Sequence, residues 1–455
     1  MQGHTRQARW LGPLVSAVAI AAALVAGAAP AAATPAKRAV PDYDGRGEAP
    51  TTAGDVLLWV PRVAMSPLYL VSEYVIRRPL GALITEMERA DLPALLVDFF
   101  TFGGSSAGLI PTMLFDFGLE AGALPSGGFY FFWDDALFDG HDLRLRAAFG
   151  GGDWIEADVA SRVALGDHGQ LSASFDYTRR KDRVFAGIGG GFGDEAIGRY
   201  GLDQTEATLG YRHQLGVRGF VEGDVRLSRY AFFAATCCGD PSLGGPIADG
   251  LYDPPDGFDS DHTYLIPELR IALDSRAVRP GDESGARGEL FGSVGRALSG
   301  YDATFARVGV QLGAFIDLYN NRVLGLRLHA EAVANLGDAR LPFRELARLG
   351  GAAPLRAFAE GRLRGQSAAA AVLEYRWPIW VWLDGDLFVE AGNVFGPGFE
   401  GLEADALRLS FGVGVRPASI EDHPFELLVA AGTGPLGDGG GVTTVRVVIG
   451  TTSGF

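Results

Sequence analysis

One pentapeptide in the sequence has the spacing of a catalytic motif. Residues 104–108 read Gly-Ser-Ser-Ala-Gly, which matches the Gly-x-Ser-x-Gly turn that presents a nucleophilic serine between a strand and a helix. Such a serine also needs a histidine and an acidic group within reach. Here the pentapeptide leads into an alternating stretch instead of a helix. We interpret residues 104–108 as a flexible hinge and predict that the chain is not an enzyme, with a hydrolase as the last alternative.

Metal and cofactor chemistry has no stronger support. The seven histidines are scattered, and no two of them have the spacing of metal ligands. The glycine-rich residues 187–193 lack the following helix that a dinucleotide-binding turn requires. The acidic residues 249–261 could bind cations, but a solvated surface is the better interpretation. We therefore predict no catalytic residue, no metal ligand and no cofactor.

The two cysteines, Cys237 and Cys238, are adjacent in sequence. They cannot join distant segments, so the chain has no disulfide framework of the kind that stabilises many exported proteins. A disulfide between the two neighbours in a surface loop and a pair of free thiols both fit the sequence. The pair of free thiols is the simpler interpretation.

Charged residues stand close to a strongly alternating segment between residues 349 and 379. The first half is a loop, broken by glycines and Pro354, that carries Arg356 and Phe358. The second half has a period of two, which predicts a strand: Glu374 lies on a polar face, and Tyr375 and Trp377 end the apolar face. Strands of membrane barrels have this pattern, apolar toward lipid and polar toward the lumen.

The N-terminus predicts an exported chain. Residues 1–33 have a basic start, an apolar stretch and a small-residue cleavage site, as in a signal peptide. Residues 34–54 are polar and contain proline and glycine, so we predict a disordered linker. Beyond the leader no run of about 18 apolar residues predicts a membrane-spanning helix. The formal net charge of −16 argues against a nucleic-acid partner.

Residues 55–106 predict a short periplasmic helical segment. Residues 55–60 could form a short strand. Ser66 and Pro67 have the pattern of a helix start, and this helix should end at Pro79. Two further helices are expected over residues 80–89 and 92–100. Since the segment is largely apolar, we expect it to pack against the periplasmic mouth of a barrel.

From residue 107 to residue 455 the alternation of period two continues. It predicts sixteen strands, hence an all-β, 16-stranded antiparallel transmembrane β-barrel. The strands are expected at 108–119, 126–134, 141–149, 153–165, 169–179, 202–215, 217–232, 262–274, 287–298, 304–316, 322–333, 366–377, 383–392, 407–415, 423–431 and 442–450.

The connections between these strands fall into two classes. Links from even-numbered to odd-numbered strands are mostly short, and the long links run from odd to even. Bacterial outer-membrane barrels have short periplasmic turns and long outer loops. The C-terminal Phe455 also agrees, because such barrels commonly end in an aromatic residue. A soluble β-sandwich or propeller is the alternative, although neither needs a charged face opposite a continuous apolar face in almost every strand.

Four short motifs then resemble the BamA/TamA superfamily of outer-membrane barrels, whose domain is also called bacterial surface antigen. They are the Leu-Arg-Ala-Phe of residues 355–358 in the sixth outer loop, followed by residues 374–376, the stretch 185–189, the turn 273–276 with Pro280, and residues 388–393. The resemblance covers about residues 107–455. It implies a bacterial outer-membrane barrel whose sixth loop folds into the lumen.

The resemblance also implies a structural lock on that loop. The arginine at the loop tip, here Arg356 beside Phe358, pairs with an acid on the barrel wall, here Glu390; Glu374 lies on the neighbouring strand. The alternation agrees, because it places Glu390 on the lumenal face. Ala357 stands where the family motif has glycine, so a positive φ at this position is in question. The alternative interpretation is an arginine in a solvated loop and two acids that line a wet lumen.

Two functions follow from the resemblance. The first is assembly or translocation of client outer-membrane or secreted proteins, through opening of the seam between the first and last strands. The second is a passive channel or structural barrel without client handling. The sequence shows no recognisable POTRA repeat, which is the client-capturing domain of the family, and this favours the second function; the Arg356–Glu390 pair favours the first. Outer-membrane lipids are the other expected partners.

Overall fold

The computed structural model describes residues 53–89, 99–103, 106–119, 122–123, 125–277, 283–380, 383–417 and 425–451. Residues 1–33 and most of the predicted linker lie outside the described residues. So do most of the third predicted helix, Gly104, Ser105, Pro280 and Phe455. Within the described residues, no helix combines the length and the apolar character needed to cross a membrane.

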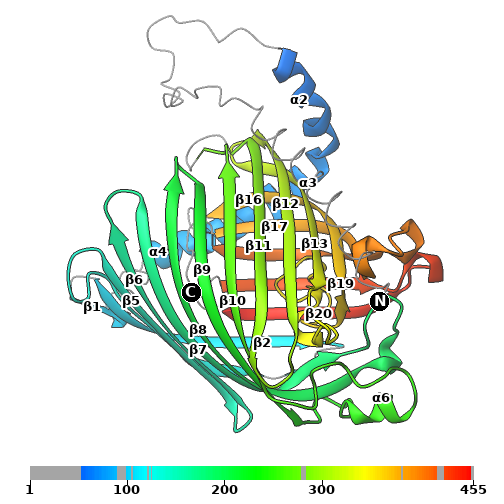
Figure 1. Cartoon of the computed structure of the whole chain (residues 1–455). Coiled ribbons are helices and arrows are strands. Elements are labelled where there is room, and N and C mark those ends of the chain that lie inside the picture. Colours follow the sequence, from blue (N-terminus) through cyan, green and yellow to red (C-terminus); the bar gives the residue numbers. More distant parts are fainter. Residues whose placement is uncertain are drawn as a thin grey trace, which may run out of the picture.

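Sixteen strands of the described chain form one closed antiparallel barrel, as the alternation predicts (Figure 1). Each strand pairs with the next in the chain, and the last pairs with the first, so the ring is complete. The prediction of a 16-stranded barrel is confirmed. The barrel strands are β2 (Ala107–Gly118), β4 (Ser126–Trp133), β5 (His141–Gly151), β6 (Trp154–Leu165), β7 (Gly169–Phe185), β8 (Gly198–Leu215), β9 (Gly219–Ala234), β10 (His262–Asp274), β11 (Gly285–Ser299), β12 (Thr304–Tyr319), β13 (Arg322–Asn335), β16 (Ser367–Trp380), β17 (Leu383–Phe395), β18 (Arg408–Pro417), β19 (Phe425–Thr433) and β20 (Val442–Thr451).

Shorter elements lie in the connections and at one end of the chain. The short strands are β1 (Thr101–Phe102), β3 (Gly122–Ala123), β14 (Ala347–Leu349) and β15 (Leu363–Gly365). The helices are α2 (Ala53–Ala64), α3 (Ser66–Leu70), η2 (Val71–Arg77), α4 (Arg78–Arg89) and α6 (Gly244–Ala248), with 3-10 turns η3 (Asp194–Ala196), η4 (Phe343–Glu345), η5 (Pro397–Phe399), η6 (Ala404–Ala406) and η7 (Leu436–Asp438).

The two faces of the wall differ as the sequence pattern requires. On β13, Leu326 and Leu328 point outward and are 47% and 48% exposed, whereas Arg327 points into the lumen and pairs with Glu374 of β16. Large apolar side chains on an outer surface are stable only if that surface meets another apolar phase. The lumen instead carries charged side chains in pairs.

Strands β7, β8 and β9 extend further than their alternation predicts. The added residues at their outer ends include Val184, Phe185 and Tyr200, each at most 2% exposed. These side chains pack against loops that fold over this end of the barrel, so both faces of the strand are covered. A strand that is covered on both faces loses the alternation from which strands are recognised.

The N-terminal helical segment departs from three predictions. Residues 55–60 belong to helix α2 and not to a strand. Pro79 does not end the helix, because α4 continues from Arg78. At the end of the π-helical stretch η2, the Arg78 N–H donates to the Glu73 carbonyl five residues back. This wider turn accommodates Pro79, which has no N–H of its own.

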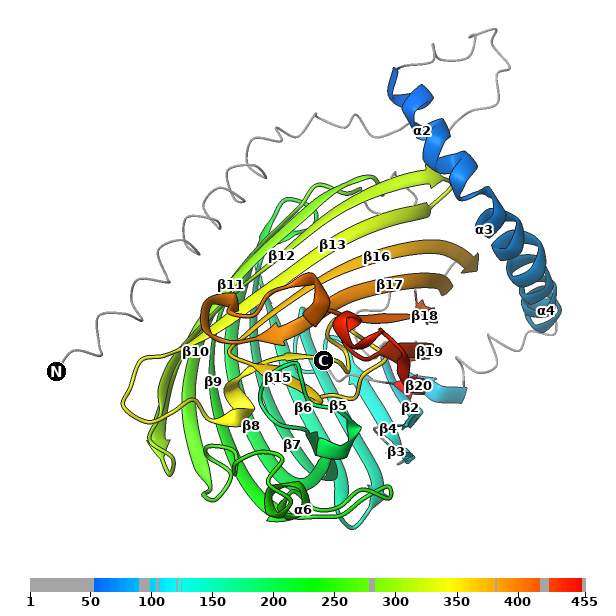
Figure 2. The ribbon, with the colours of Figure 1, turned by 90° about the vertical axis from the view of Figure 1, so that its right-hand side faces the viewer.

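The third departure is the position of the segment. We expected it at the barrel mouth, but it packs on the outside of the wall, beside one end of the strands (Figure 2). Met65, Leu68 and Ile76 contact an apolar cluster that contains Tyr375 and Trp377 of β16. The Arg62 Nε also donates to the Leu318 carbonyl at 2.6 Å. The contact residues are three, three and eight positions apart, which fits a helical period, and the apolar run 56–60 hides this period in the sequence.

Candidate functional site: a charged loop inside the barrel

The connection between β13 and β16 folds back into the barrel instead of projecting from it. Its hairpin β14–β15 lies within the ring of strands (Figure 2). Phe343, Leu349, Leu355, Phe358 and Leu363 are all fully buried there. A loop with this many buried apolar side chains is a folded plug, held by the same hydrophobic packing as a core. We call residues 336–366 the lumenal loop.

Arg356 at the tip of the lumenal loop reaches the wall at β17. Its Nε lies 3.0 Å from Glu390 Oε1, its backbone N–H donates to Glu390 Oε2 at 2.7 Å, and its Nη1 lies 3.1 Å from Asp386 Oδ2. The guanidinium also stacks 3.5 Å above the centre of the Phe388 ring. The structure therefore brings Arg356 and Glu390 together and adds Asp386 and Phe388, which the sequence analysis did not assign.

Glu374 has a different place in this cluster. It lies 3.9 Å from Arg356 Nη2, which is an ion pair without a hydrogen bond. Its closer partners are Arg327 at 2.9 Å and Arg416 at 2.8 Å. Three arginines and three carboxylates thus share one patch of the lumenal wall, and Glu374 links the two wall arginines to the loop arginine. We call Arg327, Arg356, Arg416, Glu374, Asp386 and Glu390 the wall cluster.

The backbone of the loop tip shows whether Ala357 adopts a positive φ at the position of the family glycine. Ala357 is not among the residues with positive φ, whereas Leu355 has φ +69°. The left-handed residue of this tip is therefore two positions earlier than the family glycine. The Ala357 N–H donates to Ser410 Oγ, and this hydroxyl donates to Glu390 Oε2 at 2.8 Å. Phe358 is buried against Gly432, where an added Cβ would lie 2.8 Å from its ring.

Arg446 of β20 connects the loop tip to the seam of the barrel. Its Nη1 donates to the carbonyls of Gly351 at 3.0 Å and of Arg356 at 2.9 Å. Its Nε and Nη2 bind both oxygens of Asp116 on β2 at 2.8 and 2.7 Å. β20 and β2 are the last and first strands of the ring. One arginine therefore holds the loop tip and both sides of the seam.

The base of the lumenal loop is held by polar contacts to two further parts of the chain. Arg362 donates to the Phe192 carbonyl, and Arg408 of β18 donates to the carbonyls of Gly190 and Phe192. The glycine-rich stretch 187–193 therefore acts here as a cover that supplies backbone acceptors. On the other side, Arg364 and Arg344 both donate to the Tyr200 hydroxyl.

Glu345 fixes the loop to β9 and β12. It accepts a hydrogen bond from the Tyr230 hydroxyl at 2.9 Å and lies 3.3 Å from Arg307 Nη2. Burial alone would raise the pKa of this carboxyl, but the charges of Arg307 and Arg226 and the Tyr230 hydrogen bond hold its pKa below the usual value. Glu345 is therefore ionised wherever the loop is docked at neutral pH.

The space that remains in the lumen is polar and divided. The larger cavity, of about 500 Å³, is lined by arginines and acids together, among them Arg180, Arg348 and Glu360. A smaller one of about 220 Å³ lies beside the wall cluster. Within the described residues no group of three histidine, cysteine or acidic side chains could hold a metal ion.

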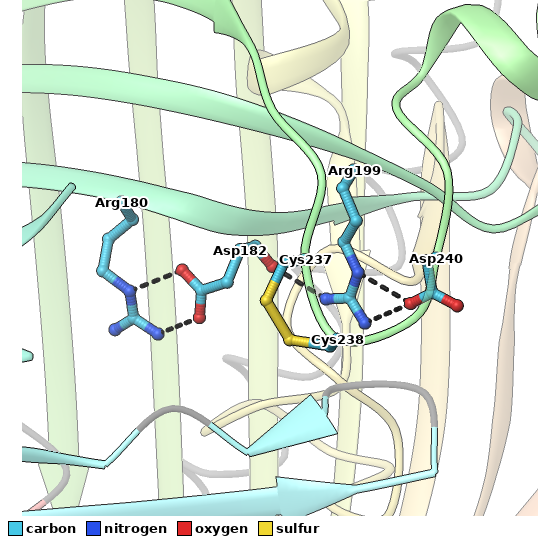
Figure 3. Close-up of a disulfide and its surroundings, with 6 residues drawn as sticks. All are labelled: Arg180, Asp182, Arg199, Cys237, Cys238 and Asp240. Atoms are coloured by element: carbon cyan, nitrogen blue, oxygen red, sulfur yellow. Dashed lines mark hydrogen bonds and ion pairs between the residues drawn. A yellow bond between two sulfur atoms is a disulfide. The ribbon is translucent and has the colours of Figure 1, made fainter. Parts of the chain in front are cut away.

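The two cysteines are not the free thiols that the simpler interpretation of the sequence predicted. Cys237 and Cys238 are joined by a disulfide in the connection between β9 and β10 (Figure 3). The same connection is anchored through Asp240, whose carboxylate receives two hydrogen bonds from Arg199 of β8, a side chain that is 1% exposed. Arg199 also donates to the Asp182 carbonyl at 2.8 Å. The disulfide thus stiffens a turn whose other end is tied to the barrel.

Comparison with known proteins agrees with this architecture. Residues 274–447 match the Omp85 superfamily domain. Among solved structures, BamA from Haemophilus ducreyi lacking POTRA domains 1–3 is similar with a TM-score of 0.50 and 16% identity, over 76% of this chain and 70% of that chain. CdiB from Acinetobacter baumannii has a TM-score of 0.47 and 12% identity, over 76% of this chain and 60% of that chain. No curated protein matches the chain in sequence. The predicted superfamily resemblance is confirmed.

Replacing Arg356 by alanine should release the loop tip. The change leaves Glu390 and Asp386 without their cation, and breaking a largely buried pair in this way costs about 3 kcal/mol. We expect proteolysis within residues 350–361 to become about a hundredfold faster. Arg340→Ala is the matched control, because Arg340 lies in the same loop and is 83% exposed. Equal cleavage of the two variants would show that Arg356 does not hold the loop.

Docking of the lumenal loop should resist moderate acid. Because the pKa of Glu345 is lowered in the folded chain, its contribution is complete above the unfolded pKa of about 4.3 and is lost only as pH falls through the lower folded value. We expect unchanged loop proteolysis from pH 8 to pH 5 and a loosened loop in Glu345→Gln already at pH 7. Asp338→Asn, at an exposed position in the same loop, should behave like the unmodified chain. Loosening of the unmodified chain at pH 6 would contradict this assignment.

Proposed function

We propose that this chain, whose residues 274–447 are an Omp85 superfamily domain, is a bacterial outer-membrane barrel that assembles or translocates client proteins through its β2–β20 seam. The membrane placement is supported by the apolar outer wall and the charged lumen described above. The client role is supported by the seam, where the ring is held by fewer strand contacts than elsewhere.

The two strands of the seam share few paired residues. β2 and β20 share five residue pairs, from Leu114 opposite Gly450 to Gly118 opposite Arg446, whereas β7 and β8 share fifteen. Residues 109–113 of β2 have no partner on the described part of β20, while Ala107 and Gly108 pair with the short strand β1. Unpaired strand edges bind additional strands, since their N–H and C=O groups still need hydrogen-bond partners. The seam is therefore the place where a client strand could be added with the smallest loss of pairing.

Contacts on the lumenal side of the seam link its opening to the position of the loop tip. Arg446 binds Asp116 across the seam and the carbonyls of Gly351 and Arg356 in the loop tip. Parting of β2 from β20 must break the bidentate pair, and displacement of the loop tip removes the other two partners of the same guanidinium. Loop position and seam closure are linked through one side chain. This contact is the observation that carries the proposed mechanism.

The alternative function, a passive channel or structural barrel, has its own support. No POTRA repeat is identified in the described part of the chain, and the segment before the barrel consists there of helices that pack on the wall. The described residues thus include no identified domain for client capture. The lumenal loop fills much of the bore, so a channel of this kind would be narrow.

A disulfide across the seam tests the proposal. In a Cys237→Ser/Cys238→Ser background, Phe115→Cys with Ile449→Cys joins paired residues of β2 and β20. The matched control, Leu427→Cys with Ile449→Cys, joins β20 to β19 and leaves the seam free. The assay is insertion of an unfolded eight-stranded outer-membrane barrel into vesicles that contain the protein.

We expect the oxidised seam variant to insert the client no faster than empty vesicles do, with recovery on reduction. The control should be unaffected by oxidation. Insertion that persists with the seam closed would overturn the mechanism. Steady conductance without any client insertion would favour the channel.

A further inference from the structure

The helical segment α2–α4 is apolar on two opposite faces. One face packs on the barrel through Met65, Leu68 and Ile76. The opposite face exposes seven large apolar side chains, between 50% and 72% accessible: Trp59, Val60, Val63, Leu70, Val71, Tyr74 and Val75. A helix that is apolar all round is stable where both faces meet apolar surroundings. The barrel covers one face of this helix, and the other face needs a second apolar phase.

The wall beneath the segment is the outer surface of the barrel. On β16, Tyr375 and Trp377 alternate with Glu374, which points into the lumen. The apolar surface continues along the wall through Leu373 and Val389, which are 48% and 50% exposed. The segment therefore lies on the surface that meets lipid if the barrel is inserted, and it does not extend into the lumen.

A charge pair fastens the segment to this apolar surface. Arg322 lies two positions before the outward-facing Leu324 on β13, so both residues are on the outer face of the barrel. Arg322 is 3% exposed. Its Nη2 lies 2.5 Å from Glu73 Oε2 in η2, and its guanidinium lies 4.6 Å from the ring of Tyr69. An arginine on the lipid face of a barrel is destabilising, less so near the membrane interface. Glu73 supplies a counter-charge to Arg322 and also pairs with Arg77 and Arg78 of the segment. This shared carboxylate ties the segment to the wall.

The segment and the wall leave a groove between them. It has a volume of about 410 Å³ and lies between Met65 and Leu68 on one side and Leu373, Leu387 and Val413 on the other. This volume falls within the 300–1,000 Å³ of typical small-molecule sites. No charged side chain lines the groove. Because this lining is apolar apart from the Tyr375 hydroxyl, an apolar occupant matches the groove.

We propose that this groove holds one acyl chain of a membrane phospholipid, with α2–α4 lying in the same leaflet as its roof. The inference rests on the membrane insertion proposed above. A phospholipid is the occupant because the groove opens on the apolar outer wall, where acyl chains are the apolar groups at hand.

Filling the groove from either wall tests this inference. Leu68→Trp adds bulk from the helix and Leu373→Trp adds bulk from β16. The control, Val63→Trp, introduces the same side chain on the outward face of the helix, where Val63 is 63% exposed. Each full-length variant is reconstituted in vesicles of palmitoyl-oleoyl phosphatidylethanolamine and phosphatidylglycerol and extracted with mild detergent. Native mass spectrometry then measures the phospholipid retained by each barrel.

The unmodified chain and Val63→Trp should each retain a single phospholipid, and both groove-filling variants should retain about tenfold less. Equal retention by all four proteins, or no retained lipid on the unmodified chain, would overturn the acyl-chain site. Vesicle flotation and heat-modifiable gel migration separate the two proposals. If the barrel floats with vesicles and no lipid is retained, only the site is wrong; if it does not float, membrane insertion is wrong as well.

Discussion

The backbone of every barrel strand must find hydrogen-bond partners on both of its edges, and this requirement organises the whole molecule. In a bilayer core no water can supply those partners, so the sheet has to close. Closure forces the first strand onto the last, and the five pairs of β2 with β20 are the shortest pairing between neighbouring strands of the described ring. The side chains then divide between an apolar outer face and a charged inner face. The lumenal loop, the wall cluster and Arg446 all depend on the enclosed polar space that this division creates.

Inside that space, charges are arranged as a network and not as isolated pairs. Glu374 binds arginines from β13 and β18 and faces the loop arginine, while Glu390 receives both the backbone and the side chain of Arg356. In such a network each ion has several partners, so the cost of ordering one side chain is shared. The network joins four neighbouring strands, β13, β16, β17 and β18, to one loop. It therefore couples the loop to a part of the wall that ends two strands before β20.

The sequence predicts the wall well and the covered regions poorly. Glu390 and Glu374 could be placed in the lumen because a strand exposed to two media keeps a strict period of two. Asp386 and Phe388 carry the same signal, four and two positions before Glu390 respectively, and could have been added to the site. Arg446 could not, because its partners belong to a distant strand and to loop carbonyls. The helix on the outer wall was misplaced because Tyr375 and Trp377, typical of a membrane interface, are covered by the chain itself.

Asp116 and Arg446 are 330 positions apart in sequence, and their contact exists only when the ring is closed. A chain that is delivered from its N-terminus therefore presents β2 long before β20 arrives. Until then β2 has one unsatisfied edge, and the lumenal loop has no complete wall to rest on. Closing of the ring is the last and most non-local step of maturation, and such steps are slow. Throughout this interval the incomplete chain carries an unpaired strand edge, and such an edge favours self-association.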